Sequence, residues 1–382
     1  MADIAPEALA TLGGTVVAAD GVTVLATSTS TGNQVAASTA ASGGEEGDEG
    51  DGESSAGTSG NDQGSTDFAR GRGEQGGESL DDRMAGSGDP GGNGGGDDSG
   101  GFGLQLGSAL ALNFSSQTAR AVVEDGSSVT AADGEVAVIA RTEDTGIRNW
   151  AEAGATSQTE DGDTSLLVSA AVAVGLYDYT AEALVGDNVT LSAARIGVAA
   201  EVSLPLGASL DKWTDLDGWI EFFETKPGLS AVDDNITEWA KAQIDTYASA
   251  TTTSSGESID IAGAVNYVDF SNTATAWVGE GSVLTATGIG TGPWSTVYGE
   301  DRSVEWTHGV TITAHAETAT IDVAGNFDSL LSPGQSSDGG KLALGAAFNW
   351  VNHDNSVTAG LADHVTVVAQ DTDLGVRATA FD

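Results

Sequence analysis

The sequence of 382 residues contains no cysteine and few basic residues. The absence of cysteine excludes disulfide frameworks, thiolate metal sites and cysteine nucleophiles. Only 13 Lys and Arg stand against 57 Asp and Glu, which gives a formal net charge of −44. Because phosphate backbones are bound by clustered Lys and Arg, nucleic acid is not an expected partner.

Long apolar runs are also missing. No run approaches the roughly 20 residues of a membrane-spanning helix, so no transmembrane segment is expected. The first residues lack the basic and then apolar succession of a secretory signal. A fragment of a longer chain, or secretion by another route, is therefore expected.

One apolar block is repeated four times along the chain. The copies are residues 104–113, 166–175, 259–268 and 342–351. Large residues alternate with small ones at the period of a β-strand. One column of large residues holds Leu110, Val172, Val265 and Phe348. The opposite face carries Ala109, Ala171, Ala264 and Ala347. Both faces exclude bulky polar groups, and the alanine face is suited to close packing.

Further elements follow each block. The second element recurs at 118–126, 180–188, 273–281 and 357–364. In the first three copies it ends with an acidic residue and then Gly or Asn, as expected of a turn that needs positive φ. A third element recurs at 129–140, 191–200 and 367–378, with a further copy at 16–26. A fourth, weaker strand at 149–155 is matched by 320–325. The repeating unit is thus about 62 residues of strands separated by turns.

This unit predicts an all-β fold, a β-solenoid (parallel β-helix) of about four to five repeats. A propeller or another all-β repeat is the alternative, and one unit could make either one wide coil or two narrow ones. The first repeat is partial and the last is truncated. Uncapped ends favour stacking on neighbouring repeats of a longer array, or identical chains joined end to end.

Insertions divide the predicted solenoid. The expected division is a partial first repeat (1–37), an acidic Gly/Ser-rich insertion (38–101), solenoid repeats (102–203), a helical insertion (204–248) and solenoid repeats with a loop near 288–303 (249–382).

The insertion at 38–101 is almost devoid of apolar residues, so it is predicted to be disordered. Its carboxylates on a Gly-rich backbone are hard oxygen ligands, which makes Asp97 and Asp98 the candidate ligands for calcium. No other cofactor is expected.

The insertion at 204–248 predicts two short helices around Pro227. Apolar residues at 236–247 follow the helical period, which favours packing of the aromatic side chains onto the solenoid over a sugar-stacking platform. The loop insertion and the residues just beyond it carry Trp294, Tyr298 and Trp306, which are the candidate contacts for a glycan or a host-surface ligand.

Catalysis is not expected. The candidate acids Asp125, Asp187, Glu280 and Asp363 fall in one column at turns, where acids serve the scaffold. The four His residues show no ligand spacing, and neither a nucleophile elbow nor a phosphate-binding loop is present. A carbohydrate-binding or polysaccharide-cleaving β-helix remains an alternative.

The repeated Leu-x-Leu-Gly-Ala-Ala-x-Asn and Thr-Ala-x-Ala-x-Val-x-Asp-Gly phrases resemble the repeat regions of very large bacterial surface adhesins, the filamentous-adhesin and leukotoxin-like proteins. The resemblance covers about 300 residues and implies secretion, a β-helical stalk and adhesion, with no catalytic residue. The sequence therefore predicts a non-enzymatic segment at the cell surface or outside the cell, acting as a rigid stalk or filament element. A self-assembling surface-layer or filament subunit is the second hypothesis.

Overall fold

The computed structural model describes residues 2–43, 102–157, 164–204, 244–254, 257–288, 309–325, 342–370 and 372–381. Regular structure in these ranges consists of strands, arranged in three parallel sheets. No helix within them is long and apolar enough to cross a membrane. The expectation of an all-β fold is confirmed, and the sheets are consistent with a parallel β-solenoid.

Sheet A is built from the four apolar blocks. Each block and the element after it form one continuous strand, where the sequence suggested two shorter ones. The strands are β1 (Ala2–Ile4), β2 (Glu7–Leu12), β6 (Phe102–Val123), β9 (Thr164–Val185), β12 (Glu257–Val278) and β16 (Leu342–Leu361). Their order is β1-β6-β9-β12-β16, with β2 also paired to β6. Strands β6 and β9 stay in register over 22 residues, as do β9 and β12.

Sheets B and C contain the return strands. Sheet B consists of β3 (Thr15–Ala18), β4 (Gly21–Ser30), β7 (Ser128–Asp144), β10 (Thr190–Leu204), β13 (Val283–Ala286), β14 (Val310–Thr318), β17 (Thr366–Ala369) and β18 (Leu374–Phe381). Sheet C consists of β5 (Gln34–Gly43), β8 (Arg148–Ser157), β11 (Thr246–Ser254) and β15 (Asp322–Ala324). The predicted match between 149–155 and 320–325 is confirmed, because β8 and β15 both pair with β11.

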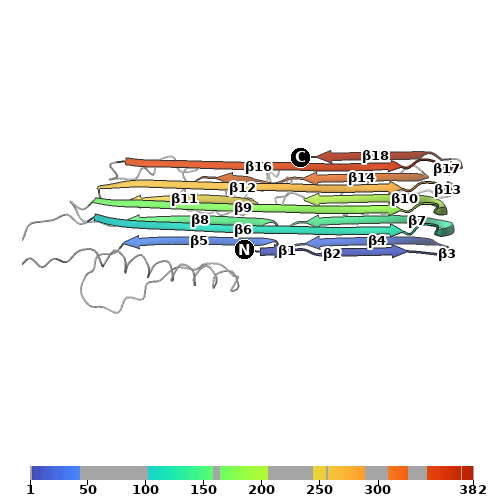
Figure 1. The fold of residues 1–382 in the computed structure, drawn as a ribbon, viewed down its shortest axis with the longest axis horizontal. Coiled ribbons are helices and arrows are strands. Elements are labelled where there is room, and N and C mark those ends of the chain that lie inside the picture. The colour runs from blue at the N-terminus through green and yellow to red at the C-terminus, as the bar shows by residue number, and fades with distance from the viewer. Residues whose placement is uncertain are drawn as a thin grey trace, which may run out of the picture.

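One sequence unit makes one wide coil of three strands. Strand β6 runs along sheet A, β7 and β8 return end to end on the other layer, and β9 begins the next coil beside β6 (Figure 1). Leu104 pairs with Leu166, 62 residues further on. Parallel pairing between such coils also distinguishes the fold from a propeller, which belongs to the antiparallel architectures.

Small side chains hold the two layers close together. One core cluster joins the inner alanines of sheet A to sheet C through Ala109, Ala111, Ala171, Ala173, Ala264, Val35, Ala151, Ala153 and Ala248. A Cβ on Gly107 would lie 2.2 Å from the carbonyl oxygen of Gly154 on the facing strand. The predicted close packing of the alanine face is confirmed. The large residues of the blocks, such as Leu110 (57 % exposed), consequently face outward.

Near the middle of sheet A, aromatic rings fill the interior. Tyr177 and Phe270 stack with ring centroids 4.8 Å apart. A Cβ on Gly175 would lie 2.5 Å from the ring of Tyr177, so glycine leaves the space that this ring occupies. Beyond the rings, valines and alanines of sheets A and B form the larger core cluster.

The turn from sheet A to sheet B repeats one backbone conformation. Gly126 (φ 68°), Asn188 (φ 55°), Gly281 (φ 69°) and His364 (φ 61°) occupy the same place in four successive coils. Gly and Asn tolerate positive φ well, as the sequence analysis expected of this turn. His364 is a less usual occupant of the same conformation.

Two boundaries differ from the sequence analysis. Strand β5 continues to Gly43, beyond residue 37, where the first repeat was expected to end. Tyr247 was assigned to a helical stripe, which is wrong, because it lies in β11 and its ring packs 5.0 Å from that of Trp150. The rest of the expected helices, at 205–243, lies outside the described residues.

Candidate functional site

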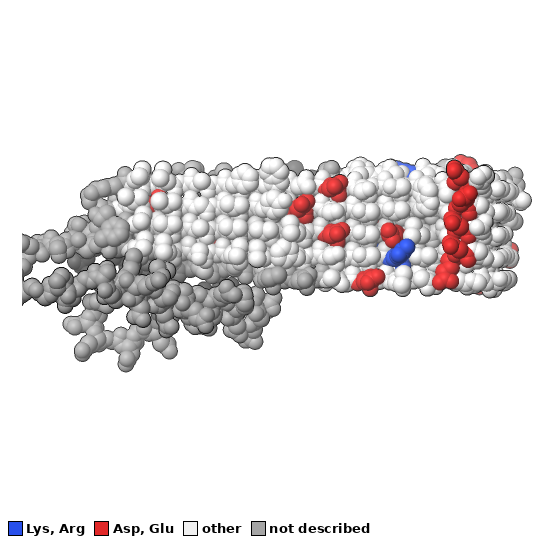
Figure 2. Space-filling model, viewed as in Figure 1, with Lys and Arg blue, Asp and Glu red and all other residues white. Residues whose placement is uncertain are grey.

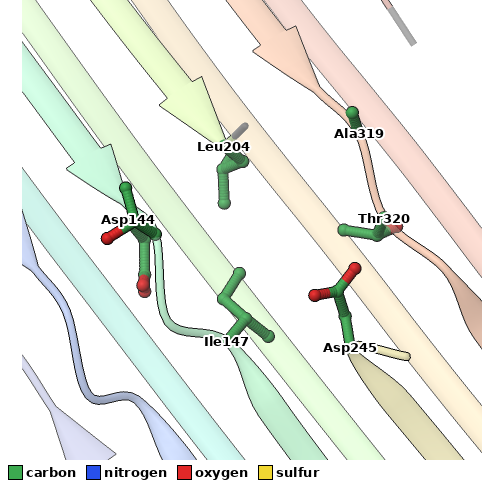
Figure 3. A pocket seen from close by; sticks show the side chains of 7 residues that line it. Asp144, Ile147, Leu204, Asp245, Ala319 and Thr320 are labelled. Carbon is green, nitrogen blue, oxygen red and sulfur yellow. The ribbon is translucent and has the colours of Figure 1, made fainter. Parts of the chain in front are cut away.

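Polar side chains gather inside the fold where sheet B passes into sheet C. Asp144 ends β7, Asp245 precedes β11 and Asp322 begins β15. The strands of B and C are nearly collinear, so the chain turns briefly between them. Asp144 caps this turn because its Oδ1 accepts the backbone N–H of Gly146 at 3.1 Å. Figure 3 shows Asp144 and Asp245 on opposite sides of a small pocket at this place.

Asp144 joins three coils. Its Oδ2 accepts hydrogen bonds from the Tyr179 hydroxyl (2.7 Å), from Gln117 Nε2 (3.2 Å) and from Asn33 Nδ2 (3.2 Å). Gln117 and Tyr179 come from neighbouring strands of sheet A, whereas Asn33 comes from the first coil. One buried carboxylate is therefore satisfied by donors from both layers.

The same kind of contact continues toward the C-terminal coils. Asp245 Oδ2 accepts the backbone N–H of Ile321 at 2.8 Å, and Asp322 accepts the hydroxyls of Thr246 and Thr320. Asn266 Nδ2 donates to Thr246 Oγ1 at 2.7 Å and to Asn349 Oδ1 at 2.9 Å. We call this row the polar seam; its members are Asn33, Gln117, Asp144, Tyr179, Asp245, Thr246, Asn266, Asp322 and Asn349.

Burial shifts the acidity of the seam. It raises the pKa of Asp245 to about 7, with the nearby charges of Asp322 and Asp144 acting in the same direction. Burial also raises the pKa of Asp144 and of Asp322. The pKa of the Tyr179 phenol lies well above its ordinary value, chiefly through burial and then through the charge of Asp144. Tyr179 thus keeps its proton and donates it to the hydrogen bond.

The carboxylates of the polar seam that border the pocket are held by contacts between coils. The pocket is lined by Asp144, Thr145, Ile147, Leu204, Asp245, Ala319 and Thr320. It is bordered by the turns between sheets B and C on three successive coils, and the carboxylates bordering it accept hydrogen bonds from neighbouring coils. General acid–base chemistry requires a carboxyl within reach of a substrate proton. In this structure Asp144 and Asp245 accept hydrogen bonds from neighbouring coils, which are contacts of the scaffold.

A second row of acids lies at the turn from sheet A to sheet B. Asp125, Asp187, Glu280 and Asp363 form one column on successive coils, as the sequence predicted, and we call this column the acidic ladder. Asp125 Oδ1 accepts the backbone N–H of Asp187, and Asp187 Oδ1 accepts that of Glu280, both at 2.8 Å. At these two steps a carboxylate serves the backbone of the next coil, which is a scaffold contact. Figure 2 shows acids forming a vertical row near one end of the molecule.

The residues singled out as possible ligand sites lie outside the described ranges. These are the calcium candidates Asp97 and Asp98 and the aromatic candidates Trp294, Tyr298 and Trp306. Of the histidines, His315 contacts Thr379 Oγ1 at 2.9 Å and His364 contacts Glu280 Oε1 at 3.3 Å. Within the part of the chain that the structure describes, no group of three or more His, Asp or Glu side chains is placed to hold a metal ion.

Sequence reasoning missed the polar seam. A signal was available, because amides interrupt the inner alanine columns of sheet A: Asn266 falls in register with Ala173, and Gln117 precedes Ala119 and Ala121 on the same face. Comparison of the chain with protein-family models, with curated proteins and with solved structures gives no match.

Proposed function

We propose that this chain is a non-enzymatic structural and adhesive segment of an extracellular surface protein, a β-solenoid that continues by adding further coils. The observation that carries the proposal is the unbroken parallel register between coils, over 22 residues from β6 to β9 and again from β9 to β12. The polar seam and the acidic ladder repeat coil-to-coil contacts along the same direction. Such nearest-neighbour contacts support a repetitive structural element.

The proportions of a coil indicate what kind of element this is. A strand of 22 residues spans about 73 Å at roughly 3.3 Å per residue, whereas five coils at about 4.8 Å each rise only about 24 Å. Each added coil therefore adds little length along the stack, but it adds surface along the whole length of its strands. A stalk built in this way is a broad ribbon whose flat faces are available for adhesion.

Self-assembly is the second candidate, and the strand edges favour it. Among the described residues, β16 pairs with β12 on one side and with no strand on the other, and β18 is likewise paired only with β14. At the opposite end, β1, β2 and β5 are also edge strands. Open edges of this kind are templates for another chain, so identical chains can stack end to end.

Duplication of one coil tests the structural role. A second copy of residues 102–163 inserted after residue 163 adds one complete unit. Small-angle scattering is expected to show a folded particle that is taller by about 4.8 Å along the stack and unchanged along the strands. A particle that lengthens along the strands, or loses β-structure by circular dichroism, would contradict modular stacking.

Two further measurements on the unmodified chain test the non-enzymatic role. Incubation with neutral and acidic polysaccharides is expected to release no reducing ends and no unsaturated uronate absorbance. Release of either product would overturn the proposal in favour of a polysaccharide-cleaving enzyme. The hydrodynamic radius is expected to be the same with and without millimolar calcium, and a calcium-dependent radius would contradict a metal-independent structural role.

A further inference from the structure

The first half of sheet A presents a broad apolar surface to solvent. Its outward side chains form four columns of large residues and one column of small ones, and we call this surface the apolar face. The large columns are Leu104, Leu166, Ile259, Leu342; Leu106, Val168, Ile261, Leu344; Leu110, Val172, Val265, Phe348; and Leu112, Val174, Tyr267, Trp350. The small column is Ser108, Ala170, Gly263 and Ala346. Leu110, Phe348 and Trp350 are each more than half exposed.

No charged residue belongs to these columns, although the chain carries a net charge of −44. Among the described side chains, outward acids lie further along the strands, at Glu7, Asp178, Glu182, Asp269 and Asp354, and then at the acidic ladder. Figure 2 shows the same separation, with a white expanse over one half of the sheet and most acids over the other half. Contiguous exposed apolar surface of this kind marks an interaction site.

We propose that the apolar face is a homodimer interface, on which a second copy of this chain packs face to face. Nine residues at about 3.3 Å and four strands at about 4.8 Å give a face of about 570 Å² per copy. Two such faces in contact remove about 1,100 Å² from water, which exceeds the roughly 1,000 Å² that a specific interface needs. The area therefore suits a stable dimer.

Charge fixes how the second copy lies. A two-fold axis parallel to the stacking direction makes the facing strands antiparallel, so the two acidic ladders point to opposite ends of the dimer. Facing strands that run parallel would bring the ladders to the same end, where like charges repel. The antiparallel arrangement also leaves both stacks growing in the same direction, so the interface is compatible with further coils.

The four inner columns are self-complementary in this orientation, and the outermost large column lies at the rim, over the column of Phe114, Leu176, Asp269 and Asn352. With the axis between the small column and the neighbouring large column, Val265 of one copy lies over Gly263 of the other, and the two-fold repeats this contact in reverse. The same pairing places Phe348 over Ala346 and Leu110 over Ser108. Two sheets packed about 10 Å apart bury side chains between them in this way.

Charge insertion on β12 tests the interface. Sedimentation velocity over a concentration series is expected to show a dimer for the wild type. Val265→Arg places an unpaired charge in the interface and is expected to weaken dimerisation by about 100-fold or more. Thr275→Arg, ten residues along the same outward face, adds the same charge outside the interface and is expected to change the dissociation constant by less than about threefold. Both variants lower the net negative charge, so added repulsion cannot explain a loss of the dimer.

Crosslinking separates face-to-face pairing from end-to-end stacking, since the chain has no native cysteine. A short bis-maleimide is expected to join Val265→Cys chains into covalent dimers but not Thr275→Cys chains. Equal crosslinking of both variants, or a wild type that stays monomeric at about 100 µM, overturns the proposal. A monomer that sediments with phosphatidylcholine vesicles or with insoluble glucan assigns the face to lipid or sugar instead. If the protein is a monomer and its Val265→Cys thiol does not react with maleimide, a segment of the same chain covers the apolar face, and the proposal is overturned.

Discussion

The hydroxyl of Tyr179 on β9 donates a 2.7 Å hydrogen bond to the carboxylate of Asp144 at the end of β7. Both side chains are buried, and the bond joins the two layers across adjacent coils. Tyr179→Phe removes a donor from a buried carboxylate, so we expect the free energy of unfolding in urea to fall by about 1.5–3 kcal/mol. Thr275→Val removes a hydroxyl from the outward face of β12 outside the apolar face, and as the control it should change this free energy by less than about 0.5 kcal/mol. Equal losses of unfolding free energy in the two variants would show that this hydrogen bond does not stabilise the protein.

The seam predicts that the protein becomes more stable on mild acidification. Burial raises the pKa of Asp245 to about 7, so the folded state takes up a proton more readily than the unfolded state between about pH 4 and pH 7. Stability therefore increases as the pH falls from 8 toward 5, and Asp144 and Asp322 act with the same sign. Asp245 alone contributes at most about 4 kcal/mol to this change in the free energy of unfolding.

Thermal unfolding at pH 8 and pH 5.5 measures this effect. The wild type is expected to have the higher Tm at pH 5.5. Asp245→Asn, which keeps an oxygen for the N–H of Ile321, is expected to raise Tm at pH 8 and to reduce the difference between the two pH values. A wild-type Tm that falls between pH 8 and pH 5.5 would be incompatible with the raised acid pKa values.

The acidic ladder predicts a stability loss at an exposed carboxylate. Asp187→Ala removes the acceptor for the backbone N–H of Glu280, and we expect unfolding to become easier by about 1–2 kcal/mol. Asp178→Ala removes an exposed acid from the outward face of β9, the strand that leads into the turn with Asp187. If the two substitutions have the same effect in urea, net charge rather than the ladder is responsible.

The turn of the last coil predicts a stabilising substitution. His364 has a φ of 61°, a conformation that glycine adopts without the steric cost of a Cβ. His364→Gly is expected to raise the free energy of unfolding by about 0.5–1 kcal/mol, since the exposed contact with Glu280 contributes little. Asn188→Gly should give a smaller gain, because Asn tolerates positive φ. If His364→Gly destabilises the protein, the contact of His364 with Glu280 stabilises it by more than the positive φ costs.

Close approach of sheets A and C predicts contrasting effects at two glycines. Gly107→Ala places a Cβ against the backbone of Gly154, so we expect a loss of about 2 kcal/mol or more. Gly32→Ala adds a Cβ in the turn between β4 and β5, with no atom within 4 Å and outside the apolar face, and should be neutral or slightly stabilising. Calorimetry of both variants checks the contrast, and a tolerant Gly107→Ala protein would mean that the layers separate easily.

Repetition made much of the fold predictable. The four apolar blocks align in the structure as they align in the sequence, so that Ala109, Ala171, Ala264 and Ala347 do form one column. The same holds for the acidic ladder. Which face of each block is buried was not predictable from hydrophobicity, because hydrophobicity favours burial of Leu110 at least as much as burial of Ala109. The narrow space between sheets A and C admits only small side chains, so the alanine face points inward. That space is set by the facing strand, which the block's own sequence does not contain.

The polar seam was not predictable from one unit. Asp144, Asp245 and Asp322 stand in different local sequences, at a strand end, before a strand and within a short strand. They come near each other only when the coils stack. Tyr247 was misassigned for a related reason, since its apolar neighbours repeat at a helical period while its real partner, Trp150, lies nearly 100 residues away in the sequence.

The width of the coil sets the order in which this molecule can fold. Leu104 meets its partner strand at Leu166, and Leu166 meets the next one at Ile259, so no hydrogen bond between coils forms until a loop of some 60 to 90 residues has closed. Loop closure of that length is an entropic barrier, and domains dominated by distant contacts fold slowly. Pairing of the first two coils is thus the step with the largest entropic cost. Every later coil then adds to a strand edge that has already formed.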